Sequence, residues 1–354
     1  FQCAILWLLR TIEPTVVFAH HRSLRPNTTR RLPRLAIDPI LDKVTSIKVH
    51  RLTCHPELVE GRRRLNQHHL ILPRNFLHMF IDTHAHIHQH ALEESSDIVD
   101  RAVAANVGGI LTAGTTVEDS QKAIDMAAHF ENVFAGVGVH PTDLDHSLTA
   151  DDLSKLSDLA ASQHVVVMSE IGIDHQEKSP SKEWQAESFH AQINIARKHE
   201  LPIVFHIREH RDNYDARSAR DATISILKET SAGEIGGTAH YFQGRWDFAK
   251  ELLDLGFNIS FAKTLTHKTD LEEIAINAPE DRMLLETDAY PQMFKKNRSK
   301  WTEPKDITIV AKKLAALRGT TAQDIQAITT NNALNMLGKR AGIVENALNA
   351  TSSS

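Results

Sequence analysis

Cysteine is nearly absent from this chain of 354 residues: Cys3 and Cys54 are the only two, and both precede every motif that carries chemistry. So few thiols exclude a framework of several disulfides and a zinc site built from thiolates. Because scarce cysteine is typical of proteins kept in a reducing cytosol, we expect a cytoplasmic location.

Long apolar runs are also missing. No stretch approaches the roughly 18 apolar residues that a membrane-spanning helix needs, so we expect no membrane association. Aromatic residues make up only 6% of the chain, and no basic-aromatic stripe that would stack single-stranded bases is apparent. The hydrophobic fraction of 41% and the charged fraction of 24% are those of a globular protein with a substantial core.

A surplus of positive charge is missing except near the start of the chain. Residues 1–78 hold 13 Lys and Arg against 5 Asp and Glu, a net of +8, whereas the whole chain has a net charge of −5. Residues 79–354 therefore carry −13. An acidic surface disfavours nonspecific contact with phosphates, although bound divalent metals reverse the sign locally.

The two ends of the chain lack a sustained hydrophobic period. Residues 1–78 contain Arg-rich stretches punctuated by proline, such as Arg22–Pro26, and the apolar run Ala4–Leu9 is too short for a signal peptide. We expect a disordered or non-native extension here, with a basic tail or a targeting segment as the alternative. Residues 341–354 are expected to form a disordered C-terminal tail.

Between these ends, over residues 79–340, β-rich apolar runs alternate with segments of helical spacing. The predicted strands are Phe80–Thr83, Gly109–Ala113, Val133–Val137, Val165–Ser169, Ile203–His206, Ile235–His240, Phe257–Phe261 and Met283–Thr287. The predicted helices are Glu93–Asn106, Val117–His129, Ala150–Ser162, Lys182–Glu200, Arg220–Thr230, Trp246–Gly256, Lys268–Ala278, Lys305–Arg318 and Ala322–Leu337.

Eight such strands predict one α/β domain, a TIM-type (β/α)8 barrel. An open doubly wound sheet is the alternative. No Gly-x-Gly-x-x-Gly follows the first strand, so the dinucleotide-binding form of that fold has no support.

Polar residues gather where the predicted strands end, which is where barrel enzymes place their chemistry. The first strand ends in His84 and His86, whose spacing turns both imidazoles to one face of a strand. The other strand ends supply His140, Glu170, Asp174, His206, Arg208, His240 and Asp288.

Each of these residues has an ordinary alternative. His206 or His240 alone is typical of a hydrogen-bonded core histidine, and Asp288 alone of a turn. Together, four histidines and two carboxylates share the carboxyl ends and none lies at an amino end. A buried carboxylate cluster repels itself unless a cation is present, so the set predicts metal binding.

The stretch from Phe80 to about Arg340 resembles the TatD family of metal-dependent hydrolases, described as deoxyribonucleases within the amidohydrolase superfamily. The resemblance is carried by Asp82–His86, Gly138–Pro141, Glu170–Asp174, His206–Arg208, His240–Gly244 and Glu286–Ala289. It implies that Glu170 bridges two metals. It also implies that His84, His86 and Asp288 complete one site, and His206 and His240 the other.

The sequence departs from the family pattern at several positions outside the ligand set. Ser169 precedes the glutamate where glycine is usual, and after the sixth strand Tyr241 stands where cysteine is common and Gln243 where serine or threonine is common. The order Ala289-Tyr290-Pro291 replaces Ala-Pro-Tyr, and Trp301-Thr302 stands where Arg-Asn is common. These changes affect the residues expected to choose the substrate.

The expected chemistry is hydrolysis by a hydroxide bound between two divalent metals about 3.5–4 Å apart. Asp288 is the expected general base, with a ligand-only role as its alternative, and Glu170 is the second catalytic residue. Arg208 and His140 are expected to hold phosphate oxygens, with an ion pair from Arg208 to Glu209 or Asp174 as the alternative. Asp174 is expected to support neighbouring ligands at the substrate site.

The substrate implied by the resemblance is DNA, or another phosphodiester, cut from a 3′ end by a monomer or weak oligomer. Imidazole ligands favour Zn or Mn, whereas the family is said to use Mg. Two alternatives remain. One is a hydrolase of another ester, amide or lactone on the same metals, and the other is a non-catalytic scaffold.

Overall fold

The structure is a computed structural model, and it describes residues 78–351. The extension expected over residues 1–78 lies outside the described residues, apart from His78. No helix within the described range is long and apolar enough to cross a membrane.

Eight parallel strands form one sheet in sequential order. They are β1 Phe80–Ala85, β2 Val107–Ala113, β3 Val133–Val137, β4 Val165–Asp174, β5 Ile203–Arg208, β6 Gly237–Ala239, β7 Asn258–Phe261 and β8 Met283–Leu285. Each joins the next through a helical crossover, as parallel neighbours require. The predicted (β/α)8 barrel is confirmed.

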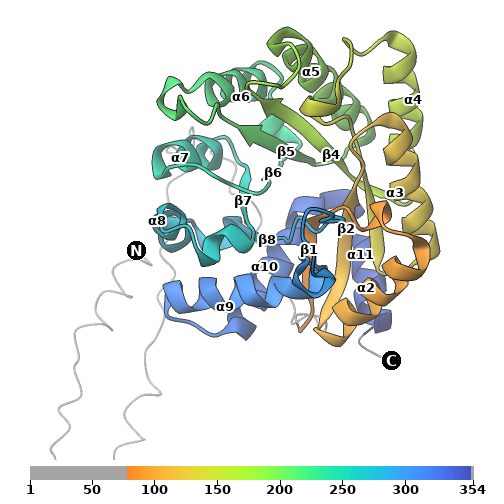
Figure 1. Ribbon diagram of the computed structural model, residues 1–354, viewed down its shortest axis with the longest axis vertical. Coiled ribbons are helices and arrows are strands. Elements are labelled where there is room, and N and C mark those ends of the chain that lie inside the picture. The colour runs from red at the N-terminus through yellow and green to blue at the C-terminus, as the bar shows by residue number, and fades with distance from the viewer. Residues whose placement is uncertain (1–77, 352–354) are drawn as a thin grey trace, which may run out of the picture. The chain divides into compact units, whose positions relative to one another are not determined.

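The helices surround the strands (Figure 1). They are α2 Leu92–Ala104, α3 Val117–His129, α4 Ala150–Ala160, α5 Lys182–His199, α6 Ser218–Glu229, α7 Trp246–Asp254, α8 Asp270–Asn277, α9 Ile307–Arg318, α10 Ala322–Leu337 and α11 Ala341–Thr351. Local sequence sets their starts: Thr149 and Thr321 each form a capping box with an aspartate three residues later, which satisfies otherwise unpaired amides.

Strand β4 runs five residues beyond its predicted end at Ser169. Its ladder with β5 continues through Gly172 opposite His206 to Asp174 opposite Arg208. Gly172 has a φ of +137°, and a Cβ there would lie 2.1 Å from the carbonyl oxygen of His206. Only glycine permits this approach, which keeps two polar strand ends adjacent.

Strands β1 and β8 meet at the carboxyl end of the barrel through backbone bonds. The Asp288 amide donates to the His84 carbonyl at 2.9 Å, and the His86 amide donates to the Ala289 carbonyl at 2.7 Å. The Asp82 carboxylate adds a link lower down, because it accepts from the Thr287 amide at 2.9 Å. The seam therefore runs through the residues expected to hold metal.

The amino end of the barrel is filled by apolar side chains. Ile81, Leu111, Phe134 and other strand residues form one buried cluster with α10 and α11, to which Leu334, Leu337, Val344, Ala347 and Leu348 contribute. Leu348 lies so close to Gly108 that a Cβ there would approach its Cδ2 to 2.6 Å. The cluster closes the barrel opposite the polar strand ends.

The prediction of a disordered tail over residues 341–354 is wrong for residues 341–351, which form α11. Three of its side chains are buried: Val344, Ala347 and Leu348. The segment is too short to show its period clearly in sequence, and its helix is stabilised by packing on the barrel.

We predict that Leu348→Ala lowers the free energy of unfolding by about 2–5 kcal/mol, because it opens a cavity against β2. Urea unfolding followed by circular dichroism measures the change. The exposed Asn346→Ala on the same helix is the control and should lie within about 0.5 kcal/mol of wild type. Equal stability of the two variants would show that α11 does not contribute to the core.

Candidate metal centre

The Glu170 carboxylate lies at the centre of the polar cluster and contacts five imidazoles. Its Oε2 lies 3.3 Å from His84 Nε2 and 3.4 Å from His86 Nε2. Its Oε1 lies 3.2 Å from His140 Nε2, 3.2 Å from His206 Nδ1 and 2.7 Å from His240 Nε2. Each oxygen therefore faces its own set of imidazoles.

The first set combines β1 with the residues after β8. His86 lies one residue beyond the end of β1, yet its Nε2 is 3.2 Å from that of His84. Asp288 Oδ1 lies 3.4 Å from His86 Nε2 and 3.9 Å from His84 Nε2. Asp288 adopts a φ of +51°, a left-handed conformation that aspartate tolerates better than most residues.

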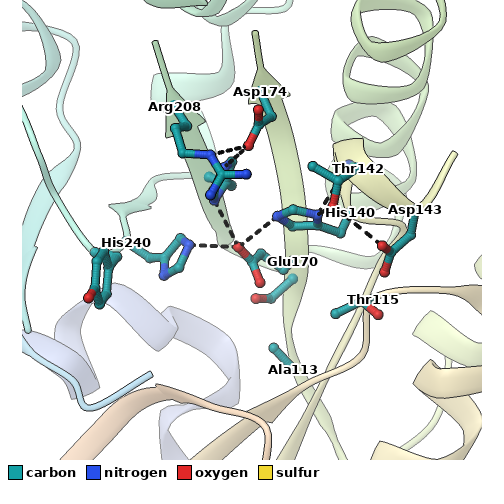
Figure 2. Close-up of polar contacts among 12 residues, drawn as sticks. Ala113, Thr115, His140, Thr142, Asp143, Glu170, Asp174, Arg208 and His240 are labelled. Carbon is teal, nitrogen blue, oxygen red and sulfur yellow. Dashed lines mark hydrogen bonds and ion pairs between the residues drawn. The ribbon is translucent and has the colours of Figure 1, made fainter. Parts of the chain in front are cut away.

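The second set comes from β5, β6 and the loop after β3. Figure 2 shows His140 and His240 approaching Glu170 from opposite sides, with Asp174 and Arg208 above it in the view. His140 was predicted to bind substrate. The structure groups it with Glu170 and His206 as a potential metal-binding triad, so it has a second candidate role.

Three of the imidazoles have an acceptor beside the ring nitrogen that points away from the centre. His86 Nδ1 lies 2.7 Å from the Ala113 carbonyl, and His206 Nε2 lies 2.9 Å from Asp174 Oδ2. His240 Nδ1 lies 3.3 Å from Glu286 Oε1. Such partners fix ring orientation and tautomer, so the facing nitrogens present lone pairs to the centre.

Two acidic residues that lie in the sequence motifs, but for which no role was predicted, support the centre. Asp82 is fully buried and accepts from both the amide and the hydroxyl of Thr287, beside Asp288. Glu286 is fully buried and accepts from the Tyr241 amide at 2.6 Å. Both precede a candidate ligand by two residues, and strand alternation is the signal that would have found them.

The electrostatics of the cluster depend on mutual compensation. Burial acts to raise the pKa of Glu170, but the charges of His240, His140 and His84 hold that pKa well below its usual range. Burial also acts to lower the pKa of His240, and Glu170 and Glu286 outweigh it, so that pKa is raised well above its ordinary value. Burial and the neighbouring His240 lower the pKa of His84.

The residues present fit divalent metals. Three groups of His, Asp and Glu have ligand atoms within 4.8 Å of one another: His84 with Glu170 and His240, His84 with His86 and Asp288, and His140 with Glu170 and His206. The contacts of the buried His240 nitrogens to Glu170 and Glu286 lack hydrogen-bond geometry, so a cation bound at Nε2, which faces Glu170, would satisfy that nitrogen. Imidazole and carboxylate donors suit Zn²⁺ and Mn²⁺.

The centre opens into a cavity of about 550 Å³ lined by Glu170, Asp288, His140, Arg208 and others. Arg208 was predicted to hold phosphate, with an ion pair as the alternative. The structure shows its Nε 2.6 Å from Asp174 Oδ2, while its side chain is 51% exposed. Glu209, the other partner considered, instead accepts from the Ala219 amide at 3.1 Å.

Comparison with known proteins identifies the family. The family model described as TatD related DNase matches residues 81–338. This chain belongs to the TatD-related DNase family. A metal-dependent hydrolase from Bacillus subtilis, YabD, is 34% identical over 262 residues, 72% of this chain and 97% of that protein.

Other TatD relatives extend the comparison. A protein from Klebsiella pneumoniae named 3′-5′ ssDNA/RNA exonuclease TatD is 29% identical over 252 residues, 69% of this chain and 92% of its own length. The crystal structure of YjjV, a TatD homolog from Escherichia coli, has a TM-score of 0.64 and 25% identity, covering 73% of this chain and 98% of that one. The chain is therefore a metal-dependent hydrolase of the TatD family.

Metal binding should release protons. In the metal-free site burial acts to lower the pKa of His86, but hydrogen bonds to Asp288 and Glu170 raise it to about 10. Below that pH the ring holds a proton that a cation must displace. Each unit by which the pH is lowered should therefore reduce the affinity for Zn²⁺ or Mn²⁺ about tenfold for each proton released. Calorimetric titration in two buffers of different ionisation enthalpy counts these protons.

The control for this titration is His86→Gln, which removes the titrating ring and should release fewer protons. Proton release that is zero in wild type, or unchanged in the variant, would contradict the assignment of His86 as a protonated ligand position.

Proposed function

We propose that this protein is a phosphodiesterase that removes nucleotides from the 3′ end of single-stranded nucleic acid, with DNA as the principal substrate. The proposal is supported above all by the geometry at Glu170, whose two carboxylate oxygens face separate sets of imidazoles. That arrangement suits a carboxylate shared by two cations, and paired cations are a recurring solution for phosphodiester hydrolysis.

Bound divalent cations would supply an activated water and neutralise charge on the phosphoryl oxygens. Asp288 is the residue placed to accept a proton. Its carboxylate is 22% exposed and lines the cavity, so it reaches both His86 and the space where substrate enters. The neighbouring imidazoles outweigh burial and lower the pKa of Asp288, which keeps it ionised and ready to act as a base.

Substrate orientation falls to side chains on the same cavity wall. His140 lines the cavity, with its Nε2 3.2 Å from Glu170 Oε1 and its Nδ1 2.7 Å from the Thr142 hydroxyl. The ion pair with Asp174 engages Arg208 through Nε, which leaves the terminal nitrogens facing a cavity suited to an anion. We assign both residues to the phosphoryl oxygens.

The choice of nucleic acid rests on the relatives named 3′-5′ ssDNA/RNA exonuclease and on the geometry of the mouth. The cavity is open enough to admit a chain end, whereas the opposite end of the barrel is filled by apolar packing.

The test uses metal-stripped protein reloaded with Mn²⁺, Zn²⁺ or Mg²⁺ and a 5′-labelled single strand, beside duplex DNA, RNA and a panel of esters and amides. We expect metal-dependent shortening from the 3′ end. Asp288→Asn should lower kcat/KM by about 10²–10⁴-fold, the usual worth of a positioned base.

The matched control is Asp281→Asn, an exposed aspartate before β8 at the opposite end of the barrel, which should retain full activity. Metal content of both variants separates loss of the base from loss of metal. Turnover of an ester or amide without shortening of any nucleic acid by metal-loaded wild type would overturn the proposal.

A further inference from the structure

A second cavity, of about 630 Å³, adjoins the metal cavity at the mouth of the barrel. The two share three wall residues: Ile207, Arg208 and Gln243. The two cavities are therefore adjacent, with the side chain of Arg208 lining both of them.

The second cavity is basic on a body that is acidic. Residues 79–354 carry a net charge of −13, yet this cavity is lined by Arg208, Arg211, Arg245 and Lys268. Its acidic lining residues are Glu209 and Asp270. The Glu209 carboxylate accepts from backbone amides at the start of α6 and pairs with Arg220, so the remaining positive charge dominates the lining.

The wall between the cavities is set by Gln243, one of the departures from the family pattern. The Gln243 amide oxygen accepts a hydrogen bond from Lys268 Nζ at 2.5 Å. A serine or threonine at position 243 is too short for this bond. The longer side chain therefore joins a cation of the second cavity to the rim of the metal cavity.

An aromatic residue lies among these cations. The guanidinium of Arg220 lies 4.0 Å from the centre of the Tyr214 ring, and that of Arg245 lies 5.1 Å from it. The Tyr214 hydroxyl has no hydrogen-bond partner among the described residues. Arg245 is 62% exposed and pairs with the exposed Asp215, a weak contact that a phosphate readily replaces.

We propose that the groove formed by Arg211, Tyr214, Arg245, Lys268 and Gln243 holds the sugar-phosphate backbone of a single-stranded nucleic acid upstream of the nucleotide at the metals. This inference rests on the proposed function and extends it from the bond cleaved to the polymer selected. Cations along a groove bind successive phosphates, and the Tyr214 ring holds Arg245 in place at the groove.

The test measures binding without turnover. Metal-loaded protein is titrated into a fluorescent, cleavage-resistant phosphorothioate strand of about eight nucleotides, and into the corresponding dinucleotide. Arg211→Gln with Arg245→Gln should weaken binding of the longer strand about tenfold and reduce the slope of log affinity against log salt by about 0.7 per lost phosphate contact. Dinucleotide binding and hydrolysis should not change.

The matched control is Lys122→Gln with Lys155→Gln, which removes two exposed, ion-paired cations from α3 and α4. It should bind both strands as wild type does. Equal binding of the longer strand by the groove variant and wild type would overturn the groove. So would equal weakening for both lengths, or displacement by polyglutamate as effective as by unlabelled strand.

Failure of the proposed nuclease activity and failure of the groove would give different results. Wild type that binds the longer strand through the groove but hydrolyses no phosphodiester would refute the nuclease activity and leave the groove standing. Hydrolysis of short and long strands with equal KM would support the nuclease and refute the groove.

Discussion

The structure depends on a buried glutamate that is surrounded by imidazoles. Glu170 is only 4% exposed, and a carboxylate at that depth is costly unless positive charge accompanies it. Five rings, from the ends of β1, β5 and β6 and from the loop after β3, surround the carboxylate, and bound cations would add positive charge. The order β1 to β8 brings these rings together although they lie between residues 84 and 240 of the chain.

The contacts that close the barrel also hold together the candidate metal centre. The last strand meets the first through Asp288 with His84 and through Thr287 with Asp82, so the two elements that carry the first ligand set cannot separate without breaking it. Burial raises the pKa of Asp82 well above its ordinary range, against the hydrogen bonds from Thr287 that act to lower it. A site assembled at a seam is sensitive to anything that loosens the first or the last strand.

The eight-strand alternation and the gathering of the candidate ligands were predictable from sequence, because strand ends in a parallel barrel share one rim whatever separates them along the chain. The supporting roles of Asp82 and Glu286 were not predicted, although strand alternation places both on the face of the candidate ligands, because neither is itself a candidate ligand. Helix α11 was missed because its order comes from packing on β2. The basic groove was invisible because its cations come from different loops and form no run in the sequence.

The apolar packing of α10 and α11 across the amino end has a consequence for the proposed hydrolysis of a nucleic-acid strand. Under the proposed function, a strand that enters at the rim has no passage through the barrel, because Leu334, Leu337 and Leu348 help to fill its amino end. The strand cannot pass through the barrel. The released nucleotide and the shortened strand must therefore both leave from the rim at which the strand entered. The shortened strand must move along the rim before each further cut. The affinity of the rim for the strand then determines how many cuts follow one binding event.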